Sequence, residues 1–176
     1  MNLAAHQPDE DYFALFGLPR SHQVDLERLD AAYEQLSFET HPDFLVTAPE
    51  EERRVAQRIS ARINEAYRTL HSELERSVYL LQLLADKQTL DPQALPPGFL
   101  AQVFELQEQV DEVEAASQGD TSALRQEFHD RLARVRQERA ALFEAAAQAA
   151  TPETLNAIQA NLNSERYLQR LLTRVN

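Results

Sequence analysis

The sequence predicts an all-α fold of one medium domain or two small ones. Only 3 of the 176 residues are glycine, at positions 17, 98 and 119, so long stretches contain nothing that interrupts a helix. Apolar residues return at steps of three and four, which is the spacing of one face of a helix. Hydrophobic residues make up 43% of the chain and charged residues 26%, a composition that favours a folded globular protein over a disordered one.

A short apolar helix is predicted within residues 11–19, where Gly17 and Pro19 end it. Two amphipathic helices follow, each indicated by an apolar stripe. The first stripe is Leu26, Leu29, Tyr33 and Leu36, and the second is Val55, Ile59, Ile63, Ala66, Tyr67 and Leu70. Because Pro42 disfavours helical geometry at His41, we expect an exposed loop between these helices, which then form a hairpin.

The segment 85–98 is the best candidate for a domain boundary, because it contains three prolines and ends in Gly98. Three further helices are predicted, at residues 99–117, 121–149 and 152–175. Thr151 is the expected N-cap of the last one, with Pro152 at its first helical position. Short connections favour antiparallel neighbours. The predicted organisation is therefore a hairpin domain in residues 1–84, a linker in 85–98 and a C-terminal three-helix bundle in 99–176.

Charge and cysteine content exclude several classes of function. The chain has 17 basic and 29 acidic residues, a formal charge of −12, which argues against a nucleic-acid partner because no basic field attracts phosphates. It has no cysteine, which excludes disulfides, thiolate metal sites and Cys nucleophiles. No apolar run reaches the roughly 20 residues of a membrane span, and the first residues lack the features of a signal peptide. We expect a cytoplasmic protein with no membrane partner.

No metal site, cofactor site or enzyme active site is predicted. The sequence has no Gly-rich phosphate loop and no helical metal-binding motif. Four histidines are scattered without ligand spacing and are expected at the surface: His6, His22, His71 and His129. An enzyme would need paired titratable groups in an enclosed pocket, and nothing in the sequence assembles one.

One tripeptide in the predicted loop is a candidate binding site. Pro42 stiffens the backbone between His41 and Asp43, and so holds an imidazole and a carboxylate outward at a fixed spacing. A rigid loop loses little entropy when it docks on a partner. On these residues alone, a polar turn that only breaks the helix is the more common interpretation.

Together with its flanks, this segment resembles the J-domain of DnaJ-type co-chaperones. The resemblance rests on residues 11–18, Tyr33, the tripeptide and residues 63–70, in the family's order and at similar spacing. In that family the loop contacts a heat-shock chaperone and stimulates its ATP hydrolysis. The resemblance implies that His41, Pro42 and Asp43 bind the chaperone ATPase, and that this chain itself holds no nucleotide.

Nearly the whole chain resembles the HscB-type co-chaperones of iron–sulfur cluster assembly. This resemblance adds residues 76–81, the proline-rich join and residues 99–114. Members of that family pair the J-domain with a C-terminal helical bundle. The bundle binds an IscU-type scaffold protein and delivers it to an HscA-type chaperone. The resemblance implies these two partners here, and we expect a monomer that is not an enzyme.

The first helix of the predicted bundle carries a second candidate site. At about 100° per residue, its valines and Leu106 share an arc of about 80° that would face the core. A second set of residues lies on a largely opposite arc of the same helix and contains both apolar and acidic side chains: Leu100, Ala101, Phe104, Glu105, Glu108 and Glu112. Apolar anchors with a charged surround are typical of a protein-docking face for a basic partner. A helix buried on two sides or a solvated acidic face is the alternative. The HscB resemblance assigns scaffold binding to this set and to Tyr167.

Two features depart from the J-domain pattern. Phe44 follows the tripeptide, where the family commonly has Lys. The second departure is the acidic charge of the helix before the loop, where J-domains generally present a basic face. This helix has one basic residue, Arg28, and five acidic residues at its start and along it: Asp25, Glu27, Asp30, Glu34 and Glu39. Arginines at 53, 54, 58 and 62 offer some positive charge on the following helix, although a solvated face is the more common role for such residues. The alternative function is a helical adaptor whose J-like domain no longer activates an ATPase.

Overall fold

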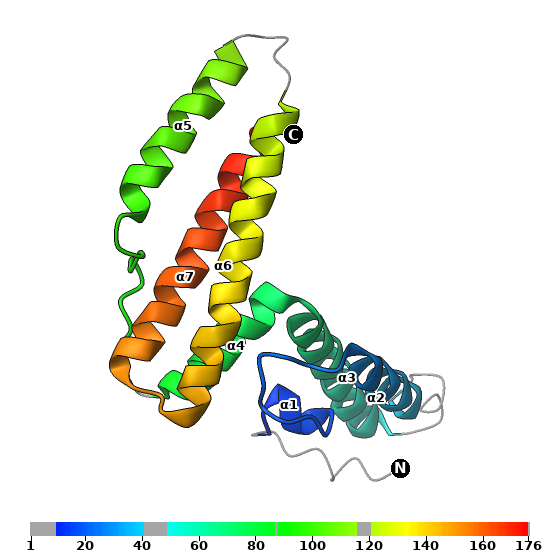
Figure 1. The fold of residues 1–176 in the computed structure, drawn as a ribbon. Coiled ribbons are helices and arrows are strands. Elements are labelled where there is room, and N and C mark those ends of the chain that lie inside the picture. Colours follow the sequence, from blue (N-terminus) through cyan, green and yellow to red (C-terminus); the bar gives the residue numbers. More distant parts are fainter. Residues whose placement is uncertain (1–9, 41–48, 87, 116–120, 176) are drawn as a thin grey trace. The chain divides into compact units, whose positions relative to one another are not determined.

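The computed structural model describes residues 10–40, 49–86, 88–115 and 121–175. Within these ranges the chain forms helices and no strand (Figure 1). The helices are α1 (Tyr12–Leu15), α2 (Leu26–Glu39), α3 (Glu50–His71), α4 (Glu73–Ala85), α5 (Phe99–Ala115), α6 (Ser122–Gln148) and α7 (Pro152–Leu172). Two compact units divide the chain, Met1–Leu80 and Leu81–Asn176. The predicted all-α fold is confirmed, whereas the domain limits at residues 84 and 98 stay a prediction.

Asp11 fixes the start of α1. Its carboxylate accepts hydrogen bonds from the Phe13 and Ala14 N–H groups at 2.9 and 3.1 Å, which satisfies donors that the first turn leaves free. Gly17 ends the segment in the left-handed region, at a φ of 61°, where the missing Cβ removes the steric penalty. Because Phe13 is fully buried, α1 is anchored in the core of the first unit.

A pair of stacked tyrosines fastens α2 to α3, which run side by side in Figure 1. The ring centroids of Tyr33 and Tyr67 are 4.0 Å apart. The Tyr33 hydroxyl donates to Asn64 Oδ1 at 2.7 Å, and the Tyr67 hydroxyl donates to Asp30 Oδ1 at 3.0 Å. That bond to Asp30, followed by partial burial, raises the pKa of Tyr67. Leu29 is buried on α2, and the predicted helical hairpin is confirmed.

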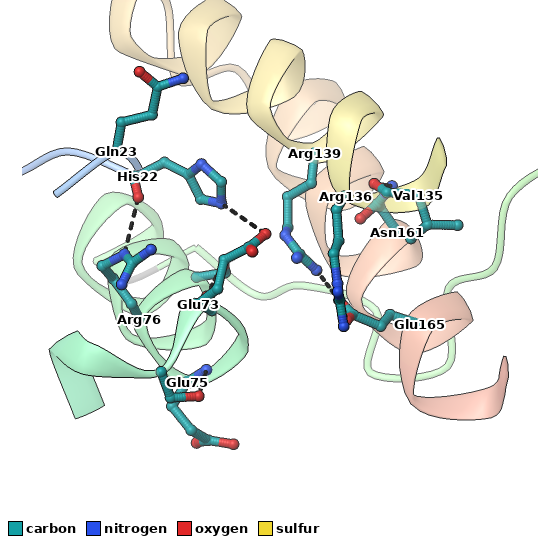
Figure 2. A network of polar contacts seen from close by, with 12 residues as sticks. His22, Gln23, Glu73, Glu75, Arg76, Val135, Arg136, Arg139, Asn161 and Glu165 are labelled. Atoms are coloured by element: carbon teal, nitrogen blue, oxygen red, sulfur yellow. Dashed lines mark hydrogen bonds and ion pairs between the residues drawn. The ribbon is translucent and has the colours of Figure 1, made fainter. Parts of the chain in front are cut away.

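A separate helix, α4, follows α3 and was not predicted. The break lies at Ser72, whose backbone is extended with ψ at 121°, and neither Gly nor Pro marks it. Arg76 on α4 is buried and donates to the carbonyl oxygens of Leu70 and His22, the latter at 2.9 Å (Figure 2). The prediction that His22 lies at the surface is wrong, because only 9% of it is exposed, with Nε2 4.0 Å from a Glu73 carboxylate oxygen.

The second unit is built on the α6–α7 hairpin, with α5 packed on it. Thr151 caps α7 as predicted, accepting from the Thr154 N–H at 3.2 Å, and Pro152 opens the helix. The three helices share one core: Phe99, Val103, Leu106, Val110, Leu124, Phe128, Leu132, Leu168, Leu171 and Val175. Helices α6 and α7 end at residues 148 and 172, one and three residues earlier than predicted, whereas the predicted end of α5 at residue 117 lies outside the described residues.

Polar contacts fix both the hairpin and the segment that enters α5. Arg139 and Glu165 form a buried ion pair between α6 and α7, and Arg136 Nε lies 3.0 Å from the same carboxylate (Figure 2). On α7, the Asn163 side-chain amide donates to the carbonyl oxygens of Pro92 and Ala94 at 3.0 and 2.9 Å. Part of the predicted linker is therefore bound to α7 before α5 begins.

Candidate functional site

Helix α5 has one buried face and one exposed apolar site. Its buried face is formed by Phe99, Val103, Leu106 and Val110, none more than 7% exposed. Leu100 and Phe104, one turn apart, are 58% and 68% exposed. Among the described residues, the other exposed large hydrophobic side chains are Leu26, at 41%, and Phe38, at 68%, both on α2. The second unit thus concentrates its exposed large apolar side chains on one helix.

Acidic side chains lie along the same side of α5 as this apolar pair. Glu105, Glu108 and Glu112 are exposed, as is Ala101. No ion pair or hydrogen bond holds these three glutamates within the part of the chain that the structure describes. Their carboxylates therefore present negative charge to solvent beside Leu100 and Phe104. The structure brings together six of the predicted scaffold-binding residues on one face of α5.

The other carboxylates of α5 are held inside the unit. Arg174, near the end of the chain, donates to Glu114 at 2.7 and 3.0 Å and to Asp111 at 2.6 Å. These hydrogen bonds, first the ones to Glu114 and then the one to Asp111, raise the pKa of the Arg174 guanidinium. The partners are about 60 residues apart, so the spacing of residues along α5 could not predict this contact. Because Arg174 binds Asp111 and Glu114, the acidic residues of α5 that remain without a described partner are Glu105, Glu108 and Glu112.

Tyr167 differs from the other six residues of the predicted surface. It is half-buried and packs against the core that α5 shares with α6 and α7. Its ring meets the ring of Phe99 edge-on, with the centroids 6.2 Å apart and the planes at 89°. Tyr167 therefore packs against the first residue of α5. A direct contact between Tyr167 and a partner stays a prediction.

The predicted chaperone-binding tripeptide, His41, Pro42 and Asp43, lies outside the described residues. The structure describes the two helix ends that flank it. On α2, the N–H and hydroxyl groups of Thr40 both donate to the Leu36 carbonyl oxygen, at 3.1 and 2.9 Å. Pro49 is the N-cap of α3. Both ends belong to the hairpin that the Tyr33–Tyr67 pair fastens.

Converging metal ligands and membrane-spanning helices are absent from the residues that the structure describes. No group of three or more potential His or carboxylate ligands converges in those ranges. None of the described helices combines the length and apolar character needed to cross a bilayer.

Comparisons of the sequence with known proteins place these features in a family. Residues 95–176 match a family model described as the HSCB C-terminal oligomerisation domain. A co-chaperone protein HscB homolog from Ralstonia nicotianae is 41% identical over 136 residues, which cover 77% of this chain and 74% of that protein. Another from Cupriavidus taiwanensis is 46% identical over 107 residues, 60% of this chain. That second alignment spans 61% of the relative's own length.

Comparison with solved structures gives the same fold. Chaperone HscB from Vibrio cholerae superimposes with a TM-score of 0.74 at 26% identity, covering 94% of this chain and 95% of that one. Human co-chaperone protein HscB superimposes with a TM-score of 0.76 at 23% identity, covering 97% and 82%, and its likeness concerns the fold alone.

Proposed function

Because this chain belongs to the HscB co-chaperone family, we propose that it brings an IscU-type scaffold protein to an HscA-type chaperone and stimulates that chaperone's ATP hydrolysis. In this proposal His41, Pro42 and Asp43 contact the chaperone. The scaffold binds the exposed face of α5 at Leu100, Ala101, Phe104, Glu105, Glu108 and Glu112, with Tyr167 beside it. The protein acts as a cytoplasmic monomer without catalytic residues or a cofactor of its own.

The observation that carries this proposal is the composition of the exposed face of α5. Two large apolar side chains are exposed, and three exposed glutamates without a partner in the described residues lie along the same side of the helix. Interfaces derive most of their affinity from a few buried anchors, while surrounding charges select the partner and steer its approach. This face therefore fits a protein that offers an apolar pocket with a basic rim.

Simultaneous binding explains how such a protein acts without chemistry of its own. A chain that holds the scaffold in one unit and contacts the chaperone through the other raises the effective concentration of each partner for the other. The scaffold is then held close to the chaperone whose ATP hydrolysis the first unit stimulates. Each activity can be removed separately, because the two predicted sites lie in different units.

A second candidate function is a helical adaptor that no longer activates an ATPase. The observation in its favour is the acidic surface of α2, where Glu27, Glu34 and Glu39 are exposed and Arg28 is the exposed basic residue. A partner surface that suits the basic face generally presented by J-domains would be repelled by this helix.

One measurement separates the two functions. Purified protein and scaffold are added to the chaperone, and its ATP turnover is compared with that for the His41→Gln variant. The proposal expects a rise in turnover that the variant lacks, with helical circular dichroism unchanged. Equal stimulation by the variant would remove the loop from the mechanism, and no stimulation by either protein would favour the adaptor.

A further inference from the structure

A hollow of about 370 Å³ lies within the second unit, between the segment that leads into α5 and the α6–α7 hairpin. Most of its lining is apolar, with Leu95 from the leading segment, Leu142 from α6 and Ala157 from α7. The polar side chains of the lining are Glu138, Asn156 and Asn161. At the roughly 30 Å³ that a water molecule occupies in the liquid, the hollow has room for about twelve non-hydrogen atoms. Its volume is typical of a site for a small ligand.

Asn161 supplies a buried acceptor to this lining. The residue is 4% exposed, and its side-chain nitrogen donates to the Val135 carbonyl oxygen on α6 at 2.9 Å. That bond fixes the orientation of the amide, because a reversed amide would set two oxygens against each other. The Asn161 Oδ1 atom is buried and accepts no hydrogen bond from the residues that the structure describes. Because a buried acceptor without a donor is costly, an N–H group that reaches it from the hollow gains a hydrogen bond.

Glu138 adds a second acceptor, at the exposed edge of the hollow. Its side chain is exposed, and no hydrogen bond or ion pair in the described ranges involves it. Asn156, by contrast, is fully used: its Oδ1 accepts from the Asp91 N–H at 3.0 Å and its Nδ2 donates to the Pro152 carbonyl oxygen at 2.9 Å. The side-chain groups of the lining that remain available are therefore acceptors, and one of them is charged. Such a lining selects a ligand that has N–H donors and positive charge.

The arginines near Asn161 are directed elsewhere. Arg136 and Arg139 of α6 both bind the carboxylate of Glu165, which lies one turn after Asn161 on α7 (Figure 2). Neither arginine lines the hollow. Their charge is partly neutralised by Glu165, whereas the Glu138 carboxylate has no described cation beside it. The negative charge at the edge of the hollow is therefore available to a ligand.

We propose that this hollow binds a small organic cation, an alkylguanidinium or alkylammonium group on an apolar body. The cation lies at the Glu138 carboxylate, a ligand N–H donates to Asn161 Oδ1, and the body packs against the apolar lining. A whole small molecule suits the volume, because an arginine side chain of a partner protein would fill only about half of it. The site uses none of the α5 residues assigned to scaffold binding, so the inference stands apart from the proposed function.

Residue-resolved NMR titration of the full chain with n-hexylguanidinium tests the proposal. We expect shifts of the Asn161 side-chain amide and of the backbone amides around Glu138 and Ala157, with a Kd of about 0.1–5 mM for a probe of this size. n-Hexylurea has the same shape without the charge and should bind about fivefold more weakly, since charge-assisted hydrogen bonds are the stronger ones. N-acetylarginine methylamide presents the cation as a protein side chain does. It should also bind more weakly than n-hexylguanidinium, because its polar amides find no partner in an apolar lining.

Two variants and a matched control test which residues form the site. Glu138→Gln removes the charge at the edge and should raise the Kd for n-hexylguanidinium about fivefold. Ala157→Leu fills the hollow from α7 and should abolish the shifts. Glu144→Gln makes the same charge change as Glu138→Gln at an exposed position of α6 outside the hollow, and should leave the Kd unchanged. Circular dichroism checks that each variant keeps its helices.

Several outcomes would overturn the proposal. Absence of shifts around the hollow at probe concentrations up to about 20 mM would mean that water alone fills it. Shifts confined to Leu100, Phe104 and their neighbours would place the probe on the exposed face of α5 instead. Equal affinity of wild type and Glu138→Gln would remove the carboxylate from the site. Tighter binding of N-acetylarginine methylamide than of n-hexylguanidinium would reassign the hollow to a side chain of a partner protein.

Discussion

Replacing the exposed apolar pair of α5 should weaken scaffold binding without weakening the fold. Complete burial of a Leu or Phe side chain is worth about 1.5–3 kcal/mol. Leu100 and Phe104 keep 58% and 68% of their surface available to a partner. The corresponding loss in Leu100→Ser with Phe104→Ser is about 2–4 kcal/mol, or about 30-fold to several-hundred-fold in Kd.

Isothermal titration of the scaffold into each variant measures this loss. Urea unfolding, followed by circular dichroism, should place the variant within about 0.5 kcal/mol of wild type, because exposed side chains contribute little to folding. Leu26→Ser is the matched control, since Leu26 is 41% exposed but lies on α2 in the first unit. A Kd within about threefold of wild type would refute the argument and place scaffold binding elsewhere.

Four further outcomes are expected. Leu106→Ala, which empties a core position that is 1% exposed, should lower the free energy of unfolding by about 2–5 kcal/mol in urea titrations. Burial raises the pKa of Asp11, but hydrogen bonds from Ala14 and Arg20 outweigh it and lower the pKa below 3.8. Its stabilisation is thus complete above pH 3.8 and lost as the pH falls through the lowered value; acid titration of Asp11→Asn should show a shallower loss. Arg174→Gln should lower the urea midpoint less than Leu106→Ala does, by an amount that salt reduces. Sedimentation should show a monomer; a dimer dispersed by the Leu100 and Phe104 substitutions would assign that face to self-association.

Much of the fold could be predicted because its signals are local. The scarcity of glycine and the 3–4 spacing of apolar residues locate the long helices, and the Thr151–Pro152 pair gives the start of α7 within one residue. The break between α3 and α4 has no such signal, since Ser72 stands in a sequence otherwise compatible with one helix. His22 is buried in a tertiary contact that no local pattern reveals, and Arg76, 54 residues away, donates to its carbonyl oxygen.

The candidate site shows the same limit. Helical geometry alone puts Leu100, Phe104 and the three glutamates on one side of α5, and the exposure of these side chains agrees. Spacing could not predict that Arg174, 60 residues away in the sequence, binds Glu114. It also could not place Tyr167, whose ring packs on Phe99 from a distant helix.

The division of α5 into two faces makes stability and recognition separable. Phe99, Val103, Leu106 and Val110 hold the helix to the bundle through burial, and Arg174 neutralises two of its acids at the far end. Those contacts fix α5 without using Leu100, Phe104 or the unpaired glutamates. Because this pair stays largely exposed on folding, a partner that covers it would add a larger energetic gain than folding provides. A substitution on the buried face should therefore change the free energy of unfolding and leave scaffold binding unchanged. A substitution on the exposed face should change scaffold binding and leave the free energy of unfolding unchanged.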